Sequence, residues 1–116
     1  MLPNRMQLNR QTEEQLKRLK AYTGLTPNIS ARLAFFRSVE SGFIYDVTAK
    51  IKLDGTLTLD KVTWLGDTTQ ATELTLKMLY PNLDVKNHIN AWAAHVSDGI
   101  ATLRNHKSMC AISLSL

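Results

Sequence analysis

Residues 84–103 read DVKNHINAWAAHVSDGIATL, and this stretch carries the clearest structural signal in the chain. Its large apolar residues follow one another at intervals of four, three, four, four and three positions: Val85, Ile89, Trp92, Val96, Ile100 and Leu103. Such intervals place side chains on one face of an α-helix. The stretch therefore predicts a long helix, opened by Asp84 and interrupted only by Gly99, that forms the main wall of the core.

A shorter helix is predicted just before it. Asp67 followed by Gln70 resembles a capping box, and Pro81 ends the segment. We expect the apolar residues of this helix to face inward, namely Ala71, Leu74, Met78 and Leu79. Together, the two segments predict a helical pair over residues 67–106.

The N-terminal segment begins with a period-2 pattern, Arg5-Met6-Gln7-Leu8-Asn9. Alternation of this kind is typical of a short half-buried strand. Met6 and Leu8 would face the core. Arg5, Gln7 and Asn9 would point outward together.

Two helices are predicted to follow the strand. The first runs from Arg10 to Gly24, a residue that favours a helix C-terminus. The second starts at Thr26 with Pro27 in its first turn and ends at Gly42. Residues 4–42 thus form a strand-helix-helix unit.

Residues 43–66 differ in sequence pattern from the segments on either side of them. Around Asp54-Gly55 the pattern returns to period 2, which predicts a β-hairpin with a three-residue loop that pairs Ile51 with Leu57 and Ala49 with Leu59. The chain has 116 residues, 44% of them hydrophobic, as expected for one ordinary domain. The predicted fold is mainly α with minor β, in a single domain over residues 1–116.

The positive charge is concentrated at one end of the chain. The first forty residues hold seven Lys or Arg and three Glu, hence +4, which is also the formal net charge of all 116 residues. The remainder is therefore neutral. Because Lys and Arg attract phosphate, a polyanion partner is expected at the N-terminal end, chiefly along the first helix, at Arg10, Lys17, Arg18 and Lys20.

No pattern in the sequence indicates catalysis. His88 and His95 are seven positions apart, which is too far for the usual i, i+4 zinc pair, so solvated or capping histidines are expected. Cys110 is the single cysteine, in an apolar alternating tail that is either an edge strand or a disordered end. We expect no enzyme activity, no cofactor, no metal and no membrane span, and a cytoplasmic location.

The strand-helix-helix unit over residues 4–42 resembles a ribbon-helix-helix module. In that family, paired strands from two chains reach the DNA major groove, and the matching positions here are Arg5, Gln7 and Asn9. This resemblance leaves open a sequence-specific transcriptional repressor or antitoxin.

Taken whole, the chain resembles the DndE family, the small E protein of bacterial DNA phosphorothioation (DNA sulfur modification). The resemblance rests on Arg5-Met6-Gln7-Leu8-Asn9, on Leu25-Thr26-Pro27-Asn28-Ile29-Ser30-Ala31-Arg32 and on the helical C-terminal half. It implies a non-catalytic accessory that binds double-stranded DNA, nicked duplex preferred, through basic positions such as Lys17 and Lys20. It also implies a homo-oligomer, expected to be a tetramer, and other phosphorothioation subunits as partners. A scaffold subunit without DNA binding of its own is the remaining alternative.

Overall fold

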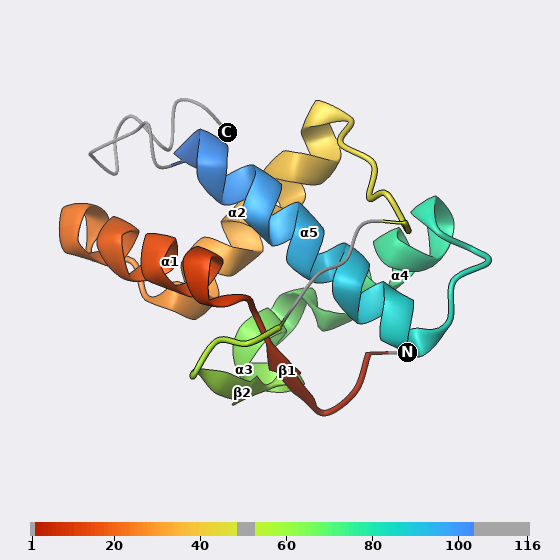
Figure 1. Cartoon of the computed structure of the whole chain (residues 1–116), viewed down its shortest axis with the longest axis horizontal. Helices are drawn as coiled ribbons and strands as arrows, with labels where there is room; N and C mark the ends of the chain where they lie inside the picture. The colour runs from red at the N-terminus through yellow and green to blue at the C-terminus, as the bar shows by residue number, and fades with distance from the viewer. Residues whose placement is uncertain (1, 49–52, 104–116) are drawn as a thin grey trace.

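The computed structural model describes residues 2–48 and 53–103, which form a mainly helical fold with one small sheet (Figure 1). In chain order the elements are β1 (Arg5–Gln7), α1 (Arg10–Thr23), α2 (Pro27–Ser41), β2 (Thr58–Asp60), α3 (Lys61–Leu65), the 3-10 helix η1 (Gly66–Thr68), α4 (Thr69–Leu79) and α5 (Val85–Leu103). Among these residues no helix is long and apolar enough to cross a bilayer. The predicted C-terminal strand or disordered end, with Cys110 and His106, lies outside the described residues.

Helix α5 runs through the middle of the molecule and packs on α2 (Figure 1). Trp92, Val96 and Ile100 are buried, which confirms the central part of the predicted helical face, whereas Val85 at its start is exposed. The side chain of Leu103 is outside the description. The two helices cross so closely at Gly99 that a Cβ there would lie 1.8 Å from the Ala34 carbonyl oxygen. Glycine at this position therefore allows the central helix pair to pack.

Helices α1 and α2 begin and end where the sequence predicts. The Asn9 side chain accepts a hydrogen bond from the Thr12 N–H at 2.7 Å and caps α1. Gly24 and Gly42 end the two helices with φ of 78° and 87°, a left-handed conformation that glycine adopts without steric cost. Local signals were sufficient here because each cap is made within its own turn.

Strand β2 pairs antiparallel with β1, with Met6 opposite Leu59. The predicted hairpin pairs Ile51 with Leu57 and Ala49 with Leu59; residues 49–52 lie outside the described residues, so these pairings stay predictions. Gly55 donates its N–H to the Leu8 carbonyl at 2.9 Å. Met6 and Leu8 are buried, and they anchor β1 in the core beside this segment. The contact joins residues that are distant in sequence, so the local turn pattern does not predict it.

A short helix absent from the sequence prediction follows β2. Helix α3 carries Trp64, which is fully buried and donates its indole N–H to the Met6 carbonyl at 2.9 Å. The Arg32 guanidinium of α2 donates to the Trp64 and Thr63 carbonyls, each at 2.9 Å, and so satisfies the end of α3. Both contacts span more than thirty residues of sequence, so no local pattern indicates them.

Helix α4 is oriented differently from the prediction. Thr72 and Leu76 are its buried residues, whereas Ala71, Leu74, Met78 and Leu79 are exposed. The helix starts at Thr69, after η1, and the inward positions Thr72, Leu76 and Tyr80 recur every four residues. Packing of Leu76 and Tyr80 against the body sets the rotation, and it turns the more apolar face outward.

A buried polar cluster, here called the His95 centre, consists of Ser38, Tyr80, His95 and Asp98. Ser38 Oγ lies 2.9 Å from His95 Nδ1 and 2.8 Å from Asp98 Oδ2, and Tyr80 Oη lies 2.6 Å from His95 Nε2. His95 has no exposed surface, so the prediction of a solvated or capping histidine is wrong. The spacing on α5 placed His95 beside the apolar stripe, but only the fold reveals its partners from α2 and the end of α4.

The Asp98 carboxylate determines the hydrogen-bond directions in the His95 centre. A carboxylate only accepts, so the Ser38 hydroxyl donates to Asp98 and accepts from His95 Nδ1–H. His95 Nε2 then accepts from the Tyr80 hydroxyl, which in turn accepts the Tyr45 N–H at 2.8 Å. Burial lowers the pKa of His95 to about 4 and raises the pKa of Tyr80, which keeps both groups neutral.

Candidate nucleic-acid interface

Helix α1 divides its side chains between the core and solvent. Leu16 and Leu19 are buried, whereas the four basic residues proposed as contacts are all exposed: Arg10, Lys17, Arg18 and Lys20. We call these four residues the basic face of α1. By helical spacing Arg10, Lys17 and Lys20 fall on one ridge, with Arg18 on the next. Within residues 2–48 and 53–103, Arg18 and Lys20 form no ion pair, so both charges are available to a ligand.

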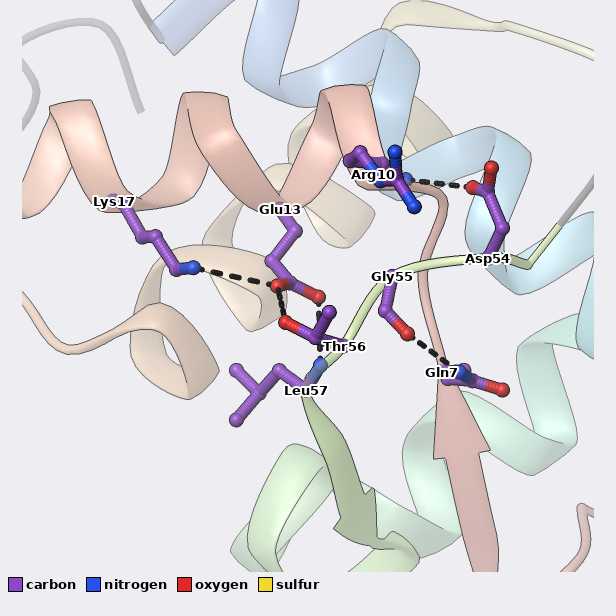
Figure 2. Close-up of polar contacts among 8 residues, drawn as sticks. All are labelled: Gln7, Arg10, Glu13, Lys17, Asp54, Gly55, Thr56 and Leu57. Carbon is purple, nitrogen blue, oxygen red and sulfur yellow. Dashed lines mark hydrogen bonds and ion pairs between the residues drawn. The ribbon is translucent and has the colours of Figure 1, made fainter.

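Residues 53–57 lie across the first turns of α1 (Figure 2). The Arg10 backbone N–H donates to Asp54 Oδ1 at 2.9 Å, and Gln7 Nε2 donates to the Gly55 carbonyl at 2.5 Å. Gly55 is buried, and a Cβ there would lie 2.3 Å from Glu13 Oε2 and 2.6 Å from the Leu8 carbonyl oxygen. Only glycine fits this crossing, which joins the loop to the helix that carries the basic face.

Glu13 connects the loop to Lys17. Its carboxylate accepts the Leu57 N–H at 2.9 Å, the Thr56 hydroxyl at 2.8 Å and the Lys17 ammonium at 3.4 Å (Figure 2). Burial raises the pKa of Glu13, but these donors outweigh burial, and the net effect lowers the pKa. Glu13 is therefore charged at neutral pH, and it holds one side of Lys17 while the ammonium stays accessible.

The three residues expected to read bases lie in different environments. Arg5 is exposed and 3.9 Å from Asp60. Gln7 bonds to Gly55, and Asn9 caps α1, so the expectation that all three point outward together is wrong for Gln7 and Asn9. Their amides satisfy backbone groups of this chain.

The ribbon pairing of the resembled module also differs here. Strand β1 already pairs with β2 of the same chain, and the Met6 carbonyl accepts the Trp64 indole N–H. A second copy would therefore meet a strand whose backbone is already partly bonded. Base reading by Arg5, Gln7 and Asn9 stays a prediction.

Sequence reasoning overlooked Glu13 as the organiser of this region. Glu13 lies four positions before Lys17 on the helix, and the two side chains form an ion pair at 3.4 Å. The loop partners come from more than forty positions away, so nothing in the local pattern signals them. The Asp54-Gly55 dipeptide lies in a segment without regular secondary structure, and Gly55 bonds to the distant Leu8.

The chemistry available at the basic face is that of four exposed cations, one of which, Lys17, is held by the hydrogen-bonded Glu13 carboxylate. Three or more His, Cys, Asp or Glu side chains that could hold a metal are not found together within the described part of the chain. Arg and Lys can bind phosphate oxygens bidentately or as point charges. The arrangement is suited to contacting a polyanion backbone.

Comparison with known proteins places the chain in a family. The model of the family described as DNA sulphur modification protein DndE matches residues 5–111. A crystal structure of DndE from Escherichia coli B7A, involved in DNA phosphorothioation modification, is 73% identical, covers 89% of this chain and 99% of its own, and superposes with a TM-score of 0.84. A DndE variant with two glycines replaced by lysine, also described as involved in DNA phosphorothioation, is 70% identical with the same coverage and a TM-score of 0.85. No curated protein matched the chain. At this identity over nearly the full chain, the protein belongs to the DndE family of DNA sulphur modification proteins.

Proposed function

We propose that this chain is a non-catalytic accessory of DNA phosphorothioation that binds DNA, nicked duplex preferred, through the basic face of α1. The observation that carries the proposal is the exposure of Arg10, Lys17, Arg18 and Lys20 on a helix whose other side is anchored in the core. Family membership supplies the biological setting. A cytoplasmic location, where DNA is accessible, is part of the proposal.

Charge supports phosphate contact rather than base reading. Phosphate contacts position a protein on DNA without requiring a particular base sequence, and each neutralised phosphate releases counterions. Four of the seven basic residues in the first forty lie on the basic face. A nick adds local flexibility, so the two flanking duplex arms can bend toward the basic face and bring more phosphates to it than a continuous duplex can.

A DNA titration tests this function. The chain should bind a nicked duplex more tightly than the same duplex when sealed, and both affinities should fall as salt rises. Fluorescence anisotropy with nicked, sealed and single-stranded forms of one sequence measures the three affinities. Equal affinity for nicked and sealed duplex would refute the preference for nicks. Absence of binding to all three at low salt would favour the scaffold alternative.

We propose a homo-oligomer as the binding form, with a tetramer as the expected copy number. Symmetric copies would repeat the basic face and so increase the number of phosphates contacted at once. Sedimentation equilibrium over a range of concentrations measures the copy number directly. A monomer at concentrations that saturate DNA would refute this part of the proposal.

The repressor alternative makes a separate prediction. It requires Gln7 and Asn9 to leave their present partners, Gly55 and Thr12, and read base edges. Affinity should then vary strongly among duplex sequences of equal length. Uniform affinity across sequences would instead support contact to the backbone alone.

A further inference from the structure

Helix α4 presents its more apolar side to solvent. Leu74 is 56% exposed and Met78 72% exposed, whereas the buried side includes Thr72, whose hydroxyl has no hydrogen-bond partner among the described residues. A surface helix normally buries its apolar stripe, because burying large side chains stabilises the fold. Here a threonine occupies the core side and two large apolar side chains stay in water. Contiguous exposed apolar surface of this kind is typical of a protein contact site.

The apolar surface continues past the end of α4. A hollow of about 510 Å³ is lined by Pro81, Leu83 and Val85 together with Lys77, Asp84 and His88. Val85 is exposed at the start of α5, and His88 is tied to the Tyr80 carbonyl at 2.9 Å. The outward side of α4 and this hollow together form what we call the α4 face. It offers an apolar strip of about 12 Å, from Ala71 to Leu79, beside a recess that can receive one side chain.

The free charge at the border of the α4 face is positive. Lys77 and Lys86 are exposed, and neither forms an ion pair within residues 2–48 and 53–103. Asp84 caps the start of α5, where its Oδ1 accepts the Asn87 N–H at 2.9 Å, and it leaves the border with two lysines and one carboxylate, which is a net positive charge. A second copy of this chain would bring the same two lysines to the contact. An acidic partner would neutralise them.

We propose that the α4 face binds an amphipathic helix of a partner protein, with apolar residues against Leu74 and Met78 and acidic residues toward Lys77 and Lys86. This is the helix-in-groove mode, in which anchors at i, i+3 or i+4 and i+7 fill an apolar surface. In Figure 1, α4 and α1 lie at opposite sides of the molecule, so the partner and a ligand on the basic face can be bound together. The proposal uses family membership only and does not depend on DNA binding.

The test uses the full chain co-expressed with the other subunits of the DNA phosphorothioation system and purified after nuclease treatment. Met78→Glu should reduce the co-purified subunits at least tenfold. Val62→Glu is the matched control, because Val62 is 70% exposed on α3, outside the α4 face, and it should leave the yield unchanged. Lys77→Glu with Lys86→Glu should also reduce the yield, and Met78→Lys should reduce it less than Met78→Glu, since an acidic partner tolerates lysine.

Three results would overturn the proposal. Equal yields for Met78→Glu and Val62→Glu would show that the face binds none of these subunits. Equal losses for Met78→Lys and Met78→Glu would contradict the acidic character of the partner. A fall in the chain's own mass by light scattering with Met78→Glu, without the subunits present, would assign the face to contacts between copies. Circular dichroism of each variant verifies that the exposed substitutions leave the fold intact.

Discussion

Two polar clusters in this protein use similar side chains in opposite ways. The cluster around Glu13 lies at the edge of α1, where a buried carboxylate holds a lysine whose ammonium remains in solvent. The His95 centre lies between α2 and α5, where every member bonds to another and His95 is fully buried. The first keeps a charge available, and the second removes charge from the imidazole.

The difference shows how burial separates a binding role from a structural one. A buried histidine stays neutral because desolvation disfavours its cation, so His95 can contribute stability but no positive charge at neutral pH. At the surface, an ion pair such as Lys17 with Glu13 is weak, and a phosphate can compete for the lysine. Each cluster can be altered with a matched control.

The largest expected effect is on the His95 centre. His95→Ala should destabilise the fold by about 3–5 kcal/mol, because it opens a cavity and leaves the Tyr80 and Ser38 hydroxyls without their partner. His88→Ala is the control, since His88 is only partly buried and its side chain makes one hydrogen bond among the described residues, to the Tyr80 carbonyl. Urea unfolding measures both. Equal losses would contradict the structural role assigned to His95.

The pH dependence of stability should also come from this centre. The folded pKa of His95 is about 4 against an ordinary 6.5, so the unfolded chain binds more protons between these values. The contribution of His95 to the free energy of unfolding is complete above pH 6.5. This contribution should fall by about 3 kcal/mol as the pH drops to 4. Glu13, whose pKa is lowered, adds its loss only below its ordinary value of 4.5. A free energy of unfolding that is flat between pH 6.5 and 5 would contradict this account, and NMR titration of the His95 ring checks the pKa itself.

The junction of α1 with residues 53–57 can be broken at Gly55. Gly55→Ala should cost about 1–3 kcal/mol, because the added Cβ meets both Glu13 and the Leu8 carbonyl. Gly24→Ala is a useful contrast, since a Cβ there meets nothing within 4 Å and only the left-handed φ of 78° is unfavourable. If thermal unfolding gave Gly55→Ala a smaller loss than Gly24→Ala, the tight crossing at Gly55 would be in doubt.

A smaller effect, on DNA affinity, is expected from a change at Glu13. Glu13→Gln frees Lys17 from its ion pair, whereas Glu14→Gln removes an equal charge from an exposed neighbour. We expect the Glu13 variant to bind DNA about twofold to fivefold more tightly than the Glu14 variant, as surface ion pairs contribute roughly 0.2–1 kcal/mol. Equal affinities by anisotropy would show that Glu13 does not restrain Lys17.

The features that the sequence predicted correctly depend on interactions between residues close together in the chain. The ends of α1 and α2 were predictable because Gly24, Pro27 and Gly42 act within a single turn. The central part of α5 was predictable because Trp92, Val96 and Ile100 repeat at helical spacing. These are properties of adjacent residues.

The features that the sequence did not predict depend on contacts between residues far apart in the chain. The partner of β2, the rotation of α4 and the environment of His95 are each set by side chains more than ten positions away. At the basic face, the exposure of Lys17 and Lys20 agrees with the helical pattern, but the hold of Glu13 on residues 56–57 does not follow from it. Helix α4 is the clearest case, because its apolar pattern suggested a core side that the fold turns to solvent.

The central claim is that the basic face of α1 contacts DNA phosphates, and the salt dependence of nicked-duplex binding tests it most directly. Lys17→Ala with Lys20→Ala should weaken binding and reduce the slope of log affinity against log salt by about 2, one for each lost phosphate contact. Lys77→Ala with Lys86→Ala, which removes the same charge from the α4 face, should leave the slope unchanged. An unchanged slope for the Lys17 and Lys20 variant, or an equal reduction for both double variants, would contradict the claim.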